Sequence, residues 1–373
     1  MSHSAEDCDD QVRPQRPRVG IVGYYRRLNL GDDLMAVMIA RMIERAGGDA
    51  LIHGNSPVFI DCGCECEQNL ETFCKRVDCI LVGGGGVLLP LNSPNPNAVG
   101  NEYSTYLLSV VRFAESLGIR LHVISIGGDS ADVVRPLRPG PIALLTSPNF
   151  RGGTYRLRQD RECLEHLTDA AMKYCPDIVL DMPRWMPFRE RESHGQLDLA
   201  FQISDLKLRA KLRRLRKLRI IPKYSLVDTP ASSMVPDATF AKFDPIAEEM
   251  SSAATISEAI ELIALSKAYV CNRLHVGVIA AAIGRQFLAL TPQKKVACFF
   301  EDLSLDLEKY VVPPNAVRSV PLRLTATRAE FTERISRAAE DSRGHADYIQ
   351  QLVSGYHVRT RETHEVSATK TLS

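Results

Sequence analysis

Short apolar runs alternate along the chain with longer segments of helical period. The runs have the length and composition of buried strands and lie at residues 19–23, 79–82, 120–126, 268–271 and 287–290. The segments between them carry the spacing of helices and lie at residues 34–48, 102–117, 257–267 and 274–284. This alternation predicts an α/β protein with parallel strands.

The middle of the chain is less regular. Residues 147–153 are rich in turn formers, residues 155–174 indicate a helix after a short strand, and residues 177–183 indicate a further strand. Residues 186–195 have the composition of a linker. We therefore expect a flexible N-terminal tail at 1–17, an N-terminal domain at 18–190, a C-terminal domain at 191–345, and a helix end and tail at 346–373.

Composition narrows the class of protein. The chain has 373 residues, enough for two domains, and 45% of them are hydrophobic. The net charge of +1 argues against general nucleic-acid binding. The polar N-terminus lacks a secretory signal, no long apolar run predicts a spanning helix, and ten cysteines without a leader suggest a reducing compartment. These features favour a cytoplasmic protein.

One segment breaks the charge balance. Residues 207–219 hold eight basic residues and no acidic one, with Leu208, Leu212 and Leu215 forming a narrow apolar stripe. Such a helix can rest on anionic lipid, which would place the protein at the inner face of a membrane. The alternative is a solvated helix packed by its leucines.

The strongest candidate for chemistry lies where a late strand gives way to a helix. Arg273 and His275 flank Leu274 at this junction. Helix N-termini bind anions, arginine offers a planar fork for carboxylate or phosphate, and histidine can move a proton. The alternative is a surface arginine and a core histidine.

The loop after the first strand is the second candidate. It contains Asn29, Gly31, Asp32 and Asp33. Gly31 permits close backbone approach, Asp32 is a candidate base, and Asp33 is a candidate helix cap. Capping is the alternative role for both aspartates.

Two further clusters carry weaker signals. Gly83 to Gly86 form a glycine loop, including Gly84 and Gly85, but lack the spacing of dinucleotide or P-loop motifs, so NAD and ATP have little support. Cys62, Cys64 and Cys66 alternate, which fits one buried strand face better than the Cys-x-x-Cys pairs of structural zinc sites.

Taken together, these motifs resemble the polysaccharide pyruvyl transferases. The shared features are N-x-G-D in the first loop, a glycine cluster after a later strand, and R-L-H-x-x-x-x-A-A-x-x-G at residues 273–284. Residues 287–303 resemble the family's apolar strand, lysine-valine step and F-x-x-D-L ending. Residues 158–164 are similar to its R-D-x-x-S helix start, with Gln159 in the arginine place and Cys163 in the serine place, and the Pro176-Asp177 step also fits.

This resemblance implies a GT-B-like fold of two Rossmann-like domains whose parallel sheets face a central cleft. It also implies transfer of the enolpyruvyl group of phosphoenolpyruvate to two hydroxyls of a sugar, giving a pyruvate ketal and phosphate, with no metal or organic cofactor. The implied acceptor is a cell-surface polysaccharide such as an exopolysaccharide, or its lipid-linked precursor.

The resemblance implies that Arg273 and His275, with Leu274 between them, contact phosphoenolpyruvate. From its residue chemistry, His275 is the candidate acid that protonates the methylene carbon. Asp32 is the candidate base for the acceptor hydroxyl. Arg158 and Lys295 are candidates for holding phosphate charge, and Arg161 competes with Arg158.

Two other functions remain open from sequence. One is a nucleotide-sugar glycosyltransferase, since fold alone does not fix function. The other is a non-catalytic glycan-binding protein.

Overall fold

The computed structural model describes residues 16–25, 29–91, 98–128, 136–187, 200–202, 225–228, 250–252, 255–264, 266–271, 274–290, 294–313 and 315–356. The basic segment at 207–219, residue Arg273 and most of both expected tails lie outside these residues. The end of the expected N-terminal tail is anchored, because the guanidinium of Arg16 donates hydrogen bonds to the carbonyl oxygens of Gly47 and Gly48.

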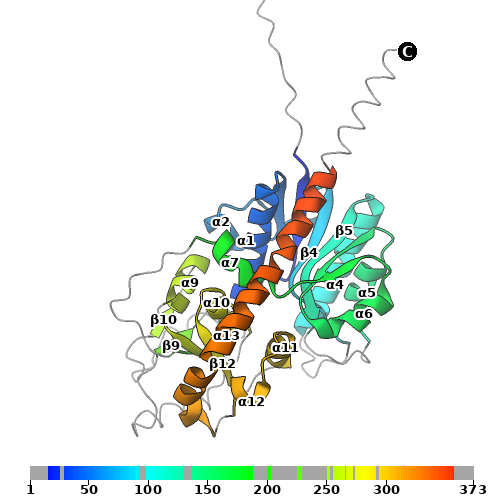
Figure 1. Ribbon diagram of the computed structural model, residues 1–373. Coiled ribbons are helices and arrows are strands. Elements are labelled where there is room, and N and C mark those ends of the chain that lie inside the picture. The colour runs from blue at the N-terminus through cyan, green and yellow to red at the C-terminus, as the bar shows by residue number, and fades with distance from the viewer. Residues whose placement is uncertain are drawn as a thin grey trace, which may run out of the picture.

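Two parallel sheets form the core of the structure, as the alternating pattern predicts (Figure 1). The first has the order β3-β2-β1-β4-β5-β6-β7, with β1 at Arg18–Val22, β2 at Asp49–His53, β3 at Cys66–Glu67, β4 at Cys79–Leu88, β5 at Arg120–Gly128, β6 at Phe150–Tyr155 and β7 at Met172–Tyr174. The second has the order β10-β9-β8-β11-β12-β13, with β8 at Ala200–Gln202, β9 at Ser225–Asp228, β10 at Met250–Ser252, β11 at Ala268–Cys271, β12 at Gln286–Leu290 and β13 at Val311–Val312. Each sheet is the centre of one Rossmann-like domain.

Helices cover both sheets. Those of the N-terminal domain are α1 at Leu30–Arg45, α2 at Pro57–Asp61, α3 at Leu70–Lys75, α4 at Ala98–Ser116, α5 at Pro139–Thr146, α6 at Arg161–Leu167 and α7 at Met182–Trp185. Those that follow are α9 at Ile256–Ala264, α10 at Leu274–Ala282, α11 at Lys294–Asp302, α12 at Leu307–Tyr310 and α13 at Val320–Ser342. Short 3-10 helices occupy Arg158–Asp160, Ile178–Asp181 and Val317–Ser319. A capping box starts α9, because the side chains and backbone amides of Thr255 and Glu258 exchange hydrogen bonds.

Helix α1 joins the two domains. Its side chains from Leu34 to Ile39 are fully buried, as its nearly continuous apolar sequence predicts. It packs on β4 of the N-terminal sheet and also touches α9 and α10 of the C-terminal domain. The sequence prediction began this helix at residue 34, but it begins at Leu30 because the side chain of Asn29 caps it. Asp32 and Asp33 therefore lie in its first turn, and the prediction of Asp33 as the cap is wrong.

Three local predictions in the N-terminal domain are wrong. The glycines after Val82 are not a loop, because Gly83, Gly85 and Gly86 remain paired with β5 inside a longer β4. Residues 147–153, expected as a link, contain the start of β6. Residues 177–183 form a 3-10 turn and α7 instead of a strand, since the carboxylate of Asp177 accepts from the amide of Val179 and starts the turn.

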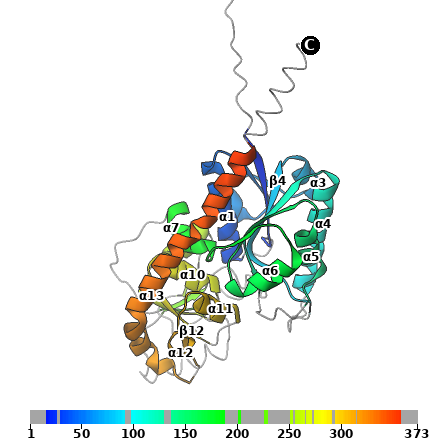
Figure 2. The same cartoon turned by 45° about the vertical axis from the view of Figure 1, so that its right-hand side comes forward.

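The C-terminal helix returns to the N-terminal domain. Helix α13 runs along both domains, and residues 344–356 continue in helical conformation (Figures 1 and 2). Ser342 donates to the carbonyl oxygen of Asp177, and the hydroxyl of Tyr348 lies 2.7 Å from Nδ1 of His122. The boundary expected at residue 345 therefore falls within an arm that packs against the first sheet.

Candidate functional site

The carboxyl ends of neighbouring strands bring the candidate residues together. Asn29 to Asp33 follow β1, Gly84 and Gly85 lie in the second half of β4, and Arg156 follows β6 directly. From the other domain, His275 follows β11 in the first turn of α10. Ligands of α/β proteins commonly bind at such strand ends, so this location favours a binding site.

His275 crosses from the C-terminal domain to contact Gly31. A β-carbon placed on Gly31 would lie 2.0 Å from Nδ1 and 2.1 Å from Cγ of His275. No side chain fits there, so the glycine is needed for the imidazole to pack against the start of α1. Gly31 and His275, which are 244 positions apart in the sequence, therefore belong to one site.

Asp32 lies on the other side of the same helical turn. Its Oδ2 accepts from Nδ2 of Asn29 at 2.6 Å, and a β-carbon on Gly85 would lie 2.6 Å from its Oδ1. The backbone of Gly85 has a φ of +119°, which favours glycine. The structure thus brings Asn29, Gly31, Asp32 and Gly85 together, while Gly84 contacts Met35 of α1.

An arginine that the sequence analysis did not single out completes the cluster. Nη1 of Arg156 lies 2.8 Å from Oδ2 of Asp177 and 3.2 Å from Nε2 of His275. Both side chains of the ion pair are only 3% exposed. Burial opposes the charge of Asp177, but the guanidinium of Arg156, helped by the hydrogen bond from the amide of Val179, holds the pKa of that carboxyl below its ordinary value.

The contact with Arg156 defines the state of His275. A guanidinium has only donors, so the Nε2 atom of His275 must accept this hydrogen bond. The imidazole therefore carries its proton on Nδ1, toward Gly31. Arg156 thus aligns the ring and supplies positive charge beside it.

Asp33 is the second carboxyl of the first turn of α1. It is 2% exposed, and its Oδ1 accepts no hydrogen bond from the residues that the structure describes. Burial, together with the charge of Asp32, raises the pKa of Asp33 to about 8. One carboxyl of the pair thus holds a proton at neutral pH.

The other charged candidates from the sequence have different contacts. The guanidinium of Arg158 covers the ring of Tyr174 at 4.2 Å, and its backbone amide donates to Asp302 of α11. Arg158 therefore links the domains, and Arg161 pairs with Glu165 on the surface of α6. Lys295 lies half-buried in the first turn of α11. Leu274 is buried at the start of α10, and Arg273, next to it in sequence, lies outside the described residues.

Sequence reasoning missed Arg156 and Asp160. The carboxylate of Asp160 accepts from the amide of Gly128 at the end of β5. One signal in the sequence could have pointed to them. Residues 158–164 resemble the R-D-x-x-S segment of the pyruvyl transferases, but Gln159 occupies the position of its arginine. Arg156 supplies a guanidinium three residues earlier.

The described residues give little support to metal or thiol chemistry. Within them, no three His, Cys, Asp or Glu side chains are grouped to hold a metal ion. Cys62, Cys64 and Cys66 are free and half-buried, and burial raises the pKa of each thiol. No helix in the described part of the chain is both long and apolar enough to span a bilayer.

No family model matches the sequence, and no curated protein matches it significantly. Many solved structures share its fold. The UDP complex of MnaA from S. aureus is 10% identical, with a TM-score of 0.59 over 93% of this chain and 98% of that one. UDP-GlcNAc 2-epimerase from Neisseria meningitidis, bound to UDP-GlcNAc, is 12% identical, with a TM-score of 0.56 over 91% and 98%. Arabidopsis thaliana UGT89C1 with UDP-L-rhamnose is 10% identical, with a TM-score of 0.57 over 91% and 99%.

These similarities establish a GT-B fold for this chain, as expected from sequence. At 10–12% identity, these similarities show the fold of this chain and do not show its function. These neighbours are complexes with UDP or a nucleotide sugar, which corresponds to the alternative function considered from sequence rather than to pyruvyl transfer.

Proposed function

We propose that this protein is a carbohydrate-active transferase that uses phosphoenolpyruvate to form a pyruvate ketal on a sugar. The observation that carries the proposal is the meeting of three resembling segments at one point. Gly31 of the first loop touches His275 of the R-L-H segment, and His275 touches Arg156, which is paired with Asp177 of the Pro-Asp step.

The charges of the site suit this donor. Phosphoenolpyruvate is a small anion with a carboxylate and a phosphate, so it needs clustered cations and a helix N-terminus. Beside His275, Arg156 provides one cation and the first turn of α10 provides the helix N-terminus. We assign Arg156 to the place that the resemblance gives to an arginine in the R-D-x-x-S segment, and we keep Arg273 as the second arginine.

The residues can divide the reaction between them. The carboxylate and phosphate of the donor draw the guanidinium of Arg156 away from Nε2 of His275 and favour the imidazolium, which protonates the methylene carbon of phosphoenolpyruvate and leaves an oxocarbenium-like centre at C2. A sugar hydroxyl, deprotonated by Asp32, attacks C2. The C2–O bond to phosphate then breaks, and a second hydroxyl closes the ketal. Of the two hydroxyl protons, one balances the new methyl group and the other leaves with phosphate.

The acceptor follows from the same proposal. Ketal formation needs two hydroxyls of one sugar unit, as in a polysaccharide or its lipid-linked precursor. A lipid-linked acceptor would bring the protein to the inner face of a membrane, where the basic segment at 207–219 could meet anionic lipid.

The test is phosphate release from phosphoenolpyruvate across a panel of sugar and lipid-linked acceptors. We expect acceptor-dependent release by the wild type, with a product heavier by one pyruvate ketal, and a loss of at least about 100-fold in His275→Asn. The matched control is His166→Asn, a substitution at an exposed position of α6. Equal rates in both variants would remove His275 from the reaction.

A second candidate is a nucleotide-sugar enzyme of the glycosyltransferase or epimerase type. It is favoured by the solved structures of the same fold that contain UDP or UDP-sugars. Titration calorimetry with UDP and with phosphoenolpyruvate separates the two. Binding of UDP without binding of phosphoenolpyruvate would replace our first proposal with this one.

A further inference from the structure

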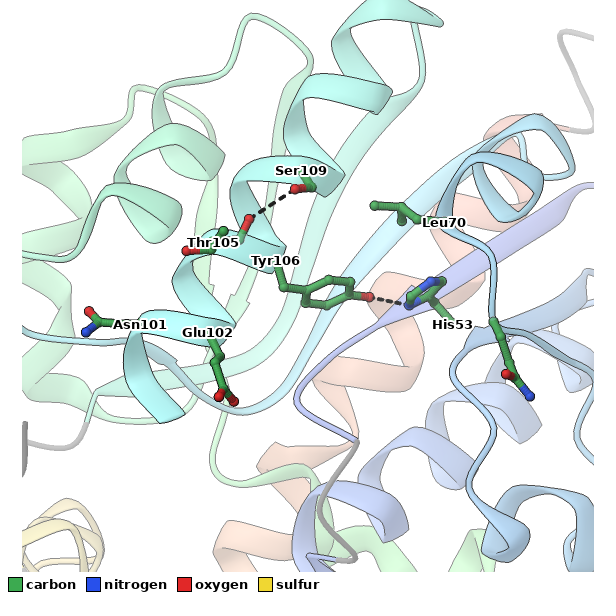
Figure 3. A pocket seen from close by; sticks show the side chains of 8 residues that line it. His53, Leu70, Asn101, Glu102, Thr105, Tyr106 and Ser109 are labelled. Atoms are coloured by element: carbon green, nitrogen blue, oxygen red, sulfur yellow. Dashed lines mark hydrogen bonds between the residues drawn. The ribbon is translucent and has the colours of Figure 1, made fainter. Parts of the chain in front are cut away.

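A cavity of about 620 Å³ that is widely open to solvent lies on the surface of the N-terminal domain, and its lining shares no residue with the His275 cluster. One wall is the first half of α4, and the opposite wall comes from the end of β2 and the start of α3 (Figure 3). This volume is in the range of small-molecule sites. It opens at the same end of the sheet as Asp32, because β2 is the neighbour of β1.

The lining has the chemistry of a site for an uncharged polyhydroxyl compound. Helix α4 contributes the polar side chains of Asn101, Glu102, Thr105 and Ser109, which offer both donors and acceptors. None of the described residues that line the cavity is lysine or arginine. The carboxylate of Glu102 would also repel phosphate, so this is a poor site for a nucleotide or a second phosphoenolpyruvate.

An aromatic platform lies in the same cavity. The ring of Tyr106 points across the pocket to His53, with the hydroxyl 2.5 Å from Nδ1, and the two rings are stacked with centroids 5.3 Å apart (Figure 3). A fixed tyrosine presents an apolar face and a polar edge. That combination matches the C–H face and hydroxyl rim of a sugar ring.

A row of rings connects this cavity to the proposed reaction centre. The ring centroids of Tyr106 and Tyr103 are 6.2 Å apart, and those of Tyr103 and Tyr24 are 5.0 Å apart. Tyr24 lies two residues after the end of β1, in the segment of chain that leads to Asp32 in the first turn of α1. The row of rings therefore runs from the cavity to the segment that precedes Asp32.

We propose that this cavity binds an uncharged sugar unit of the acceptor, adjacent in the glycan to the unit that receives the pyruvyl group at Asp32. The role of the cavity as an acceptor site rests on the proposed function. The class of ligand follows from the residues that line the cavity. It requires an acceptor of at least two sugar units, with one unit stacked on Tyr106 and the next presented to Asp32.

The experiment measures sugar binding and donor binding separately in the full chain. The probes are the methyl glycosides of glucose, galactose and mannose, together with lactose, cellobiose and maltose, titrated by saturation-transfer NMR. Phosphoenolpyruvate affinity is measured by calorimetry. Ser109→Trp fills the cavity, and Ser116→Trp is the matched control because Ser116 lies exposed on the same helix outside the cavity.

We expect at least one disaccharide to bind the wild type and Ser116→Trp equally, and to bind Ser109→Trp at least about 10-fold more weakly. Phosphoenolpyruvate affinity should stay within about 2-fold in all three proteins. Thr105→Trp, at an exposed position of the same wall, should repeat the effect and guards against misfolding of the first variant.

Two results would overturn the inference: no sugar of the panel binds the wild type, or both tryptophan variants bind as the wild type does while remaining folded. Failure of the proposed function looks different. In that case phosphoenolpyruvate does not bind the wild type, and the sugar titrations still report on the cavity.

Discussion

The contact between Gly31 and His275 makes a sharp prediction for Gly31→Ala. The added methyl would lie 2.0 Å from Nδ1 of His275, whereas ordinary contacts begin near 3.4 Å. The imidazole or the start of α1 must therefore move by about 1.4 Å. A displacement of about 1 Å at a catalytic group can lower a rate about 100-fold.

The stability effect can be weighed in the same way. Overpacking of this kind lowers the free energy of unfolding by about 1–3 kcal/mol, whereas replacing a glycine within a helix by alanine raises it by about 0.5–1 kcal/mol. We therefore expect a net loss of about 1–2 kcal/mol in the free energy of unfolding, with phosphate release reduced about 100-fold. Urea unfolding and the phosphate assay measure the two quantities.

Two controls isolate the contact. Gly355→Ala adds a methyl in a helix with no atom within 4 Å of it, so it should leave stability unchanged or slightly higher. In a His275→Ala background the ring atoms are gone and only Cβ of residue 275, 2.6 Å from the methyl, remains, so Gly31→Ala should destabilise the protein less than it does in the wild type. Wild-type stability and activity in Gly31→Ala alone would refute the reasoning.

Three further predictions concern buried polar groups. Asp177→Ala leaves Arg156 buried without its partner, so we expect a loss of about 3–5 kcal/mol in urea unfolding, and a loss under about 1 kcal/mol would contradict the ion pair's role. Burial raises the pKa of Asp33 from 3.8 to about 8, so the folded protein holds this proton more tightly than the unfolded chain. Its contribution to stability is complete below pH 3.8 and is lost as the pH rises to about 8, and Asp33→Asn should therefore melt higher than the wild type at pH 8 but not at pH 4. His345→Ala removes the hydrogen bonds to Pro176 and Thr154 and leaves a cavity, which should cost about 2–4 kcal/mol in the same unfolding assay; an unchanged midpoint would show that water replaces the ring.

The sequence by itself determined the architecture and part of the site. Apolar runs of strand length between helical segments specify parallel α/β domains, because each element must bury its own apolar face. The same patterns predicted α9, α10, β11 and β12. They also predicted that four candidate residues lie at strand-to-helix junctions, namely Asn29, Gly31, Asp32 and His275. Junctions of this kind lie at the carboxyl ends of the strands whatever the rest of the chain does.

Tertiary structure alone decided which of these residues meet. Glycines that read as a loop stay in β4 because a neighbouring strand completes their hydrogen bonds, which a local pattern does not report. Arg156 was hidden among four arginines between residues 151 and 161, and only the buried carboxylate of Asp177 distinguishes it. The position of His275 against Gly31 depends on how two domains pack through α1. Local propensity fixes the elements, but long-range packing and the pairing of buried charges select the partners.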